Sequence, residues 1–154
     1  MKVSTVMSRR VHTAREHDSL EQAARIMWDH DCGYVPVIDD FGAIVGVVTD
    51  RDVAMAACLR DQRLAEISIA SVMSKRVHTC GADDPVDVAE RIMRREKVRR
   101  IPVEGRDGRL VGVVSLNDIA RRSQTLRGRL TRALWPREVT KTLAAICEPR
   151  ARSV

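Results

Sequence analysis

The residues best suited to chemistry come in two matching pairs, each directly after an apolar run. Thr49 is followed three residues later by Asp52, and Ser115 is followed by Asp118 at the same spacing. The apolar runs predict buried strands, and the apolar spacing beyond each hydroxyl residue predicts a helix that begins there. A strand-to-helix junction exposes unpaired backbone N–H groups and the positive end of a helix dipole. Each pair could therefore serve an anionic ligand.

The same spacing has a second interpretation that needs no ligand. A Ser or Thr followed three residues later by an acid is a variant of the capping box, which stabilises the start of a helix. One pair of side chains can fill both roles. The sequence leaves the cap and the ligand contact open as alternatives.

The elements that position these pairs belong to a duplicated unit. Residues 6–54 align with residues 72–120 without a gap, and 21 of the 49 aligned pairs are identical. Only two copies occur, so the pattern favours a tandem domain duplication over an open repeat array. We expect a first unit with its linker at 1–66, a second unit at 67–125, and a basic helical tail at 126–154.

Each copy predicts the element order β-α-β-β-α. In the first copy a short extended piece precedes a helix at 19–28, which Ser19 or Asp18 caps. Two strands joined by a Gly/Asp turn follow, and a helix covers roughly 50–60. Pro36, and Pro102 in the second copy, fall inside the first strand of each hairpin. A proline there predicts an edge strand or a bulge.

Composition narrows the class of protein. The 154 residues contain four widely spaced cysteines without a C-x-x-C pair, which indicates reduced thiols. No apolar run reaches signal-peptide or membrane-spanning length, so we expect a soluble cytoplasmic protein without a membrane partner. The charge of +6 is uneven: residues 121–154 hold nine Lys/Arg against two Glu, a net +7, which leaves −1 for residues 1–120.

Taken together, these motifs resemble the tandem cystathionine β-synthase (CBS) domain pair, or Bateman module. Both copies have an opening Val-x-Thr, a strand with an internal Pro, and Gly-h-h-Ser/Thr-x-x-Asp, where h is apolar, and the resemblance covers about residues 3–125. It implies an α/β (α+β) fold of two units related by pseudo-twofold symmetry, with clefts between their sheets. The chain looks like the stand-alone bacterial CBS-pair signalling proteins.

The resemblance also implies a function. Members of the family commonly dimerise and bind an adenosine-containing ligand such as AMP, ADP, ATP, NAD or S-adenosylmethionine. They act as sensors and not as catalysts, so the expected regulatory ligand is an adenine nucleotide, with no cofactor and no catalytic residue. We expect a homodimer that signals to a further protein partner by a change in conformation.

Carried over by position, the resemblance assigns a role to each recurring residue. Asp52 and Asp118 would accept hydrogen bonds from the two ribose hydroxyls, because an ionised carboxylate has only acceptor sites. Thr49 and Ser115 would face phosphate. Thr13 with the backbone of Tyr34 and Val35 would frame the adenine in the first copy, and Thr79 with the backbone of Arg100 and Ile101 in the second. Pro36 and Pro102 would hold that strand apart and so leave its backbone groups free for base recognition.

The copies differ beside the site. Arg99 and Arg100 stand where the first copy has Gly33 and Tyr34. Guanidinium groups suit phosphate, although these two could equally continue a solvated cationic patch with Arg94, Arg95 and Lys97. The same ambiguity holds for Arg51. Two sites of unequal affinity are expected, and the sequence does not rank them.

Other chemistries have less support. His12 and His78 recur, and His30-x-Cys32 and His78-x-Cys80 bring soft ligands close together, but a metal site needs three or four converging ligands. We therefore predict no metal. No nucleophile, base and acid stand in a catalytic order, and no glycine-rich phosphate loop occurs.

The basic tail carries the alternative function. Clustered arginines could bind DNA or an acidic partner, which would make the protein an interaction module without a sensor role. Against this, Trp135 is the only aromatic residue in the tail, and Pro136 sits where a second helix would begin. We expect instead a solvated helix whose apolar stripe docks on the module or on a partner subunit. That stripe comprises Val139, Leu143 and Ile146.

Overall fold

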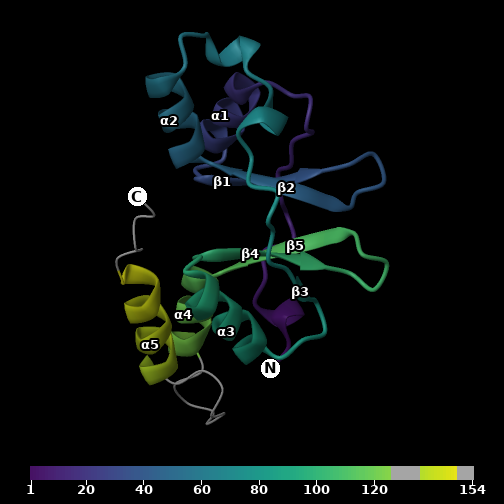
Figure 1. The fold of residues 1–154 in the computed structure, drawn as a ribbon. Coiled ribbons are helices and arrows are strands. Elements are labelled where there is room, and N and C mark those ends of the chain that lie inside the picture. The colour runs from purple at the N-terminus through teal and green to yellow at the C-terminus, as the bar shows by residue number, and fades with distance from the viewer. Residues whose placement is uncertain (126–135, 149–154) are drawn as a thin grey trace. The chain divides into compact units, whose positions relative to one another are not determined.

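Two alternating patterns in the chain, strands rich in Val and Ile and helices with one apolar face, form the elements of a mixed α+β fold. A computed structural model describes residues 1–125 and 136–148 (Figure 1). The described residues group into two compact bodies. We call residues 10–77 with 107–110 the first-repeat body, and residues 1–9, 78–106, 111–125 and 136–148 the second-repeat body.

The first-repeat body contains two helices and one hairpin. α1 (Leu20–Asp29) precedes β1 (Tyr34–Ile38) and β2 (Ile44–Thr49), and α2 (Asp50–Leu59) follows. Ser19 caps α1 in a capping box with Gln22, as predicted. The expected opening strand is reduced to one parallel bridge between Ala14 and Val37. Short 3₁₀ turns at Leu64–Glu66 and Ile69–Ser71 complete this body.

The second-repeat body keeps the opening strand. Its elements are β3 (Cys80–Gly81), α3 (Val86–Glu96), β4 (Arg100–Glu104), β5 (Leu110–Ser115), α4 (Leu116–Thr125) and α5 (Pro136–Cys147), with a 3₁₀ turn at Val3–Thr5. The sheet order is β3-β4-β5, and β3 runs parallel to β4. The β-α-β-β-α order is thus complete here.

The two strand prolines differ in their surroundings. β1, which contains Pro36, belongs to a two-stranded sheet and has an irregular register at Val37/Ile38, as predicted. β4, which contains Pro102, lies between two strands, so the edge prediction is wrong for this copy. The short β3 pairs only with Val103 and Glu104. No partner on that side therefore needs the N–H that Pro102 lacks.

The residues at the start of each repeat, together with those just before it, pack in the body of the other repeat. The backbone N–H of Val3 donates to Asp84 (2.8 Å) in the second-repeat body, and that of Ile69 donates to Asp18 (2.8 Å) in the first. Each segment also bridges the second hairpin strand of the other repeat, Ser8 with Val113 and Ser74 with Val47. The duplicated sequence blocks and the compact bodies therefore do not have the same boundaries.

Two aligned glycines leave room for these segments, which we call exchanged because each packs in the body of the other repeat. A Cβ on Gly46 would lie 2.5 Å from the sulfur of Met73, and a Cβ on Gly112 would lie 2.7 Å from that of Met7. Both glycines are buried in their strands. The glycine of the recurring motif is thus required by packing, because a side chain there would collide with a buried methionine.

The C-terminal helix α5 packs on α3 and α4 (Figure 1). Pro136 occupies its first position, where the missing N–H costs nothing. Val139 and Ile146 pack against the core, as docking on the module predicts, but Leu143 is 46 % exposed and does not dock there. Thr142 is buried instead, and its hydroxyl donates to the carbonyl of Glu138 (2.9 Å). This internal bond satisfies the buried hydroxyl group.

Part of the predicted tail falls outside the described residues. Trp135 and five of the nine basic residues of 121–154 lie there, so the structure describes the nucleic-acid alternative only in part. These are Arg127, Arg129, Arg132, Arg150 and Arg152. Among the residues that are described, no helix has both the length and the apolar character needed to cross a bilayer.

Candidate functional site

The first-repeat junction is held by a complete capping box. Thr49 ends β2, and its N–H and its hydroxyl both donate to Oδ2 of Asp52, at 2.8 and 2.7 Å. The N–H of Asp52 donates back to Oγ1 of Thr49 at 3.3 Å. The capping interpretation of this pair is confirmed. The cap also fixes the orientation of the Asp52 carboxylate.

The second-repeat junction repeats the cap and adds an ion pair. The N–H and hydroxyl of Ser115 donate to Oδ2 of Asp118 at 2.9 and 2.5 Å. In addition, Nη2 of Arg121 donates to Oδ1 of Asp118 at 2.8 Å. The Asp118 side chain is 11 % exposed and that of Arg121 is 78 % exposed. The residue aligned with Arg121 in the first copy is Met55.

The cap decides how much of each carboxylate is left for a ligand. Oδ2 already accepts two hydrogen bonds in both bodies, and an ionised carboxylate offers about four acceptor sites in all. Oδ1 of Asp52 accepts no hydrogen bond from any described residue, whereas Oδ1 of Asp118 accepts one from Arg121. The first-repeat carboxylate therefore has the greater free capacity for ribose hydroxyls.

The hydroxyls are less available than the sequence suggests. The protons of Thr49 and Ser115 both point to a carboxylate, so neither hydroxyl can donate to phosphate unless the cap hydrogen bond opens. The helix N-terminal amides and nearby guanidinium groups remain as phosphate donors. The phosphate role of the two hydroxyls stays a prediction.

The strand start of the first-repeat body lies beside its junction. The register places Tyr34 opposite Thr49 on the neighbouring strand. Thr13 precedes Ala14, whose N–H donates to the carbonyl of Pro36 at 3.1 Å. The structure therefore brings the predicted adenine-framing residues of this body to the same end of the hairpin as the cap. Val35 and Pro36 are buried, while Thr13 and Tyr34 are partly exposed.

The second-repeat body has the same arrangement. The N–H of Leu116, the first residue of α4, donates to the carbonyl of Arg99 at 3.0 Å. Arg100 begins β4, and Thr79 directly precedes β3, which pairs with β4. Ile101 and Pro102 are buried within β4. Each body thus gathers its own set of predicted residues around one junction.

The arginines at these junctions differ from those on α3. In the described part of the chain, the guanidinium groups of Arg99 and Arg100 make no ion pair, and neither does that of the exposed Arg51. Arg94 and Lys97 instead bind acids of the C-terminal segment, Glu138 and Glu148, both at 3.3 Å. The patch proposed for Arg99 and Arg100 is therefore divided, because Arg94 and Lys97 hold that segment.

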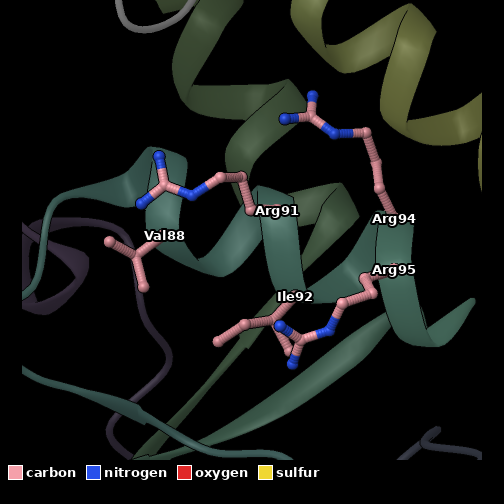
Figure 2. Close-up of a pocket in the computed structure, with 5 residues that line it drawn as sticks. All are labelled: Val88, Arg91, Ile92, Arg94 and Arg95. Atoms are coloured by element: carbon pink, nitrogen blue, oxygen red, sulfur yellow. The ribbon is translucent and has the colours of Figure 1, made fainter.

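A cavity of about 540 Å³ lies on α3 (Figure 2). It is lined by Val88, Arg91, Ile92, Arg94 and Arg95, none of them a predicted site residue. Its arginines have acidic partners: Arg91 with Asp87, Arg94 with Glu138, and Arg95 with Glu96. Their charge is largely neutralised, so this cavity does not compete with the junctions as an anion site.

One buried acid was missed by the sequence analysis. Glu90 of α3 is 2 % exposed, and its Oε1 has no hydrogen-bond partner among the described residues. Burial raises the pKa of Glu90 to about 7, Arg94 opposes the rise, and Glu138 and Asp87 add to it. The signal was present, because Glu90 lies on the apolar stripe of α3 beside Val86 and Met93.

The recurring histidines have structural partners. The ring of His12 stacks on His30, with 3.3 Å between centroids, and Nε2 of His78 lies 3.1 Å from Oε2 of Glu96. His30 and Glu96 are themselves aligned in the two copies. No cluster of three or more metal-ligating side chains occurs in residues 1–125 and 136–148. Burial raises the pKa of the Cys80 thiol to about 12, so this thiol remains protonated.

Comparison with known proteins gives a consistent family. The model of the CBS domain matches residues 3–58 and 69–124. A homoserine O-acetyltransferase of Methanococcoides burtonii is 33 % identical over 77 % of this chain, which spans only 23 % of that enzyme. An uncharacterized 17.7 kDa protein of Acidianus ambivalens is 32 % identical, over 78 % of this chain and 71 % of its own length.

The structural comparison agrees with the sequence comparison. The CBS domain pair of protein MJ0100, solved with 5′-methylthioadenosine and S-adenosyl-L-methionine, has a TM-score of 0.73 and 28 % identity. The match covers 82 % of this chain and 98 % of that one. The predicted CBS pair fold is therefore confirmed, although β3 has no full counterpart in the first-repeat body.

Proposed function

Because the chain belongs to the CBS domain family and carries two CBS domains, we propose that it is a regulatory module that binds an adenosine-containing ligand. The ligand class comprises AMP, ADP, ATP, NAD and S-adenosylmethionine. One observation supports this above all: each body holds a partly buried carboxylate at the start of a helix and fixes it by a cap. A related CBS pair was solved in complex with two adenosyl compounds, 5′-methylthioadenosine and S-adenosyl-L-methionine.

The proposed chemistry is recognition and not catalysis. Asp52 and Asp118 accept hydrogen bonds from the ribose hydroxyls, while the strand starts at Tyr34 and Arg100 lie against the base. Capping keeps each carboxylate oriented before the ligand arrives, which lowers the ordering cost of binding. The chain spans less than a quarter of the acetyltransferase it resembles, so that enzyme's activity is not assigned to it.

Occupancy would act through a change in conformation. A ligand shifts an equilibrium between two arrangements only by as much as its affinity differs between them. We propose that the ligand favours one arrangement of the two bodies in a homodimer, and that a protein partner responds to this arrangement. The ligand residues occupy only the junctions, which leaves the remaining surface of each body for such a partner contact.

Calorimetric titration tests the proposal. AMP, ATP, NAD and S-adenosylmethionine are titrated into the unmodified protein and into Asp52→Asn and Asp118→Asn. Asparagine can keep an amide oxygen for the cap but replaces the other acceptor by a donor, so ribose recognition is lost while the helix start survives. Binding that weakens in these variants supports the function. Absence of binding by all four ligands at millimolar concentration would contradict it.

A further inference from the structure

The two junctions share their caps but differ in the charge around them. We compare six positions around each junction, residues 33, 34, 50, 51, 52 and 55 of the first copy, with their aligned partners 66 residues later. In the first-repeat body these positions carry the anions Asp50 and Asp52 and the cation Arg51, a net charge of −1. In the second-repeat body they carry three guanidinium groups against Asp118, a net charge of +2. These guanidinium groups belong to Arg99, Arg100 and Arg121.

Geometry brings the differing residues to the junctions. A Cβ on Gly33 would lie 2.5 Å from Oδ2 of Asp50, so this acid lies directly over the glycine at the start of α2. At the equivalent place, buried Leu116 donates its N–H to the carbonyl of Arg99. The first copy therefore has the exposed Asp50 carboxylate at the helix start. The second copy has the apolar Leu116 there, and the residue whose carbonyl it contacts, Arg99, carries a guanidinium group.

A phosphate group would experience opposite environments at the two junctions. Helix N-terminal amides attract an anion in both bodies, but the Asp50 carboxylate repels a phosphate at the same helix end. At the second junction, Arg99 and Arg100 make no ion pair with a described residue and can form charge-assisted bonds to phosphate. Arg121 also neutralises Asp118, the only acid among the aligned positions there.

For the ribose hydroxyls, in contrast, the first junction offers more free acceptor capacity than the second. Asp52 keeps the whole of Oδ1 for the sugar hydroxyls, whereas Asp118 shares Oδ1 with Arg121. The first junction thus depends more on the nucleoside part of a ligand and the second more on its phosphate. Resting on the proposed function, we infer that the first-repeat site selects adenosine compounds without a 5′-phosphate and the second-repeat site selects 5′-phosphorylated ones.

Titration with adenosine and AMP at each isolated site tests this inference. Asp118→Asn leaves the first site to be measured, and Asp52→Asn leaves the second. In the Asp118→Asn protein adenosine is expected to bind at least as tightly as AMP. In the Asp52→Asn protein AMP is expected to bind about tenfold more tightly than adenosine, as charge-assisted hydrogen bonds to phosphate would give.

A matched exchange removes the proposed phosphate contacts. In the Asp52→Asn background, Arg99→Gly with Arg100→Tyr installs the residues of the first copy and should abolish the preference for AMP. Arg106→Gly is the control, because this exposed arginine of the same body pairs with Asp83. In the Asp52→Asn protein itself, rising salt should weaken AMP binding and leave adenosine binding nearly unchanged.

The outcomes separate the two proposals. Equal AMP-to-adenosine preference at both isolated sites, or a preference that survives the Arg99/Arg100 exchange, would overturn the inference while the proposed function stands. Failure of the unmodified protein to bind adenosine, AMP and the other adenosyl ligands would overturn the proposed function and the inference with it. A circular dichroism spectrum like that of the unmodified protein establishes that each variant is folded.

Discussion

In the first-repeat body Asp52 has Met55 one turn further along its helix, whereas in the second-repeat body Asp118 has Arg121 and is bonded to it. The cap around each acid is otherwise the same, down to the two donors that Oδ2 accepts. Duplication thus preserved the residues that build the junction and changed the residues that surround it. The comparison indicates that shared motifs report the fold, while unshared neighbours set specificity.

The same contrast holds for the helices. In the second-repeat body α5 covers α3 and α4, and Arg94 pairs with Glu138 of that helix. In the first-repeat body the residue aligned with Arg94 is Trp28, which is 87 % exposed. At this position the second-repeat body thus has a polar partner for its C-terminal helix, and the first-repeat body has an exposed aromatic ring.

Substitution of the aligned glycines should have the largest effect and should not distinguish the bodies. Gly46→Val and Gly112→Val each force a side chain against a buried methionine and the backbone of the exchanged segment. We expect each to lower the free energy of unfolding by about 2–4 kcal/mol. Denaturant unfolding gives the values. Gly108→Ala should cost less, because a Cβ at this loop position would meet nothing within 4 Å and only the backbone strain at φ +75° opposes it.

Glu90 of α3 should make the stability of the second-repeat body depend on pH. The first-repeat body lacks this dependence, because the aligned residue of α1 is Ala24. The folded pKa of Glu90, about 7, lies above the ordinary 4.5, so the folded state holds a proton that the unfolded state releases. Stability should therefore fall as pH rises from about 4.5 to 7, by about 2–3 kcal/mol in all. Thermal unfolding of the unmodified protein and of Glu90→Gln at pH 5 and 8 measures this.

The Glu90→Gln variant is the control for the predicted loss of stability with rising pH. Glu90→Gln cannot ionise, so its stability should change less between pH 5 and 8, and it should exceed the unmodified protein in stability at pH 8. An equal pH dependence in both proteins would show that other groups cause it.

Removal of the ion pair to α5 should have a smaller effect. Arg94→Ala breaks the ion pair with Glu138, whose two side chains are partly exposed, and a hydrogen bond to the hydroxyl of the buried Thr142. We expect a loss of about 1 kcal/mol or less, together with faster amide hydrogen exchange in α5. Arg25→Ala, which breaks an exposed pair with Glu21 in the first-repeat body, should leave exchange in α5 unchanged.

The smallest predicted effect concerns the ribose contact. Arg121→Met installs the residue of the first copy and frees Oδ1 of Asp118, so adenosine should bind the second site about two- to fivefold more tightly. The reciprocal Met55→Arg should weaken adenosine at the first site by a similar factor. Calorimetry in the Asp52→Asn and Asp118→Asn backgrounds assigns each change to its site. Unchanged affinity in both would show that Arg121 does not compete for the carboxylate.

Much of this architecture follows from local sequence signals. The capping boxes at Ser19 and Thr49 and the hairpins between apolar runs depend on contacts within a few residues, so they could be predicted. The exchange of residues 1–9 between bodies could not, because its evidence is a long-range contact such as Met7 against Gly112. A repeat alignment places that segment equally well in either body.

The site shows the same limit. Sequence spacing predicted that Asp52 and Asp118 stand at equivalent junctions, but it did not predict that Arg121 bonds one of them. The burial of Thr142 in place of Leu143 depends on how α5 rotates against α3, and a stripe read at helical spacing allows either residue. Such choices are decided by packing between elements and not by periodicity.

Native mass spectrometry with S-adenosylmethionine and AMP tests the central claim most directly. Spectra of the unmodified protein should show mass additions that correspond to one or both ligands and should report the number of subunits. The doubly substituted Asp52→Asn/Asp118→Asn protein should keep the same subunit number and lose the additions. Equal ligand binding by the two proteins would contradict the assignment of both carboxylates to ligand recognition.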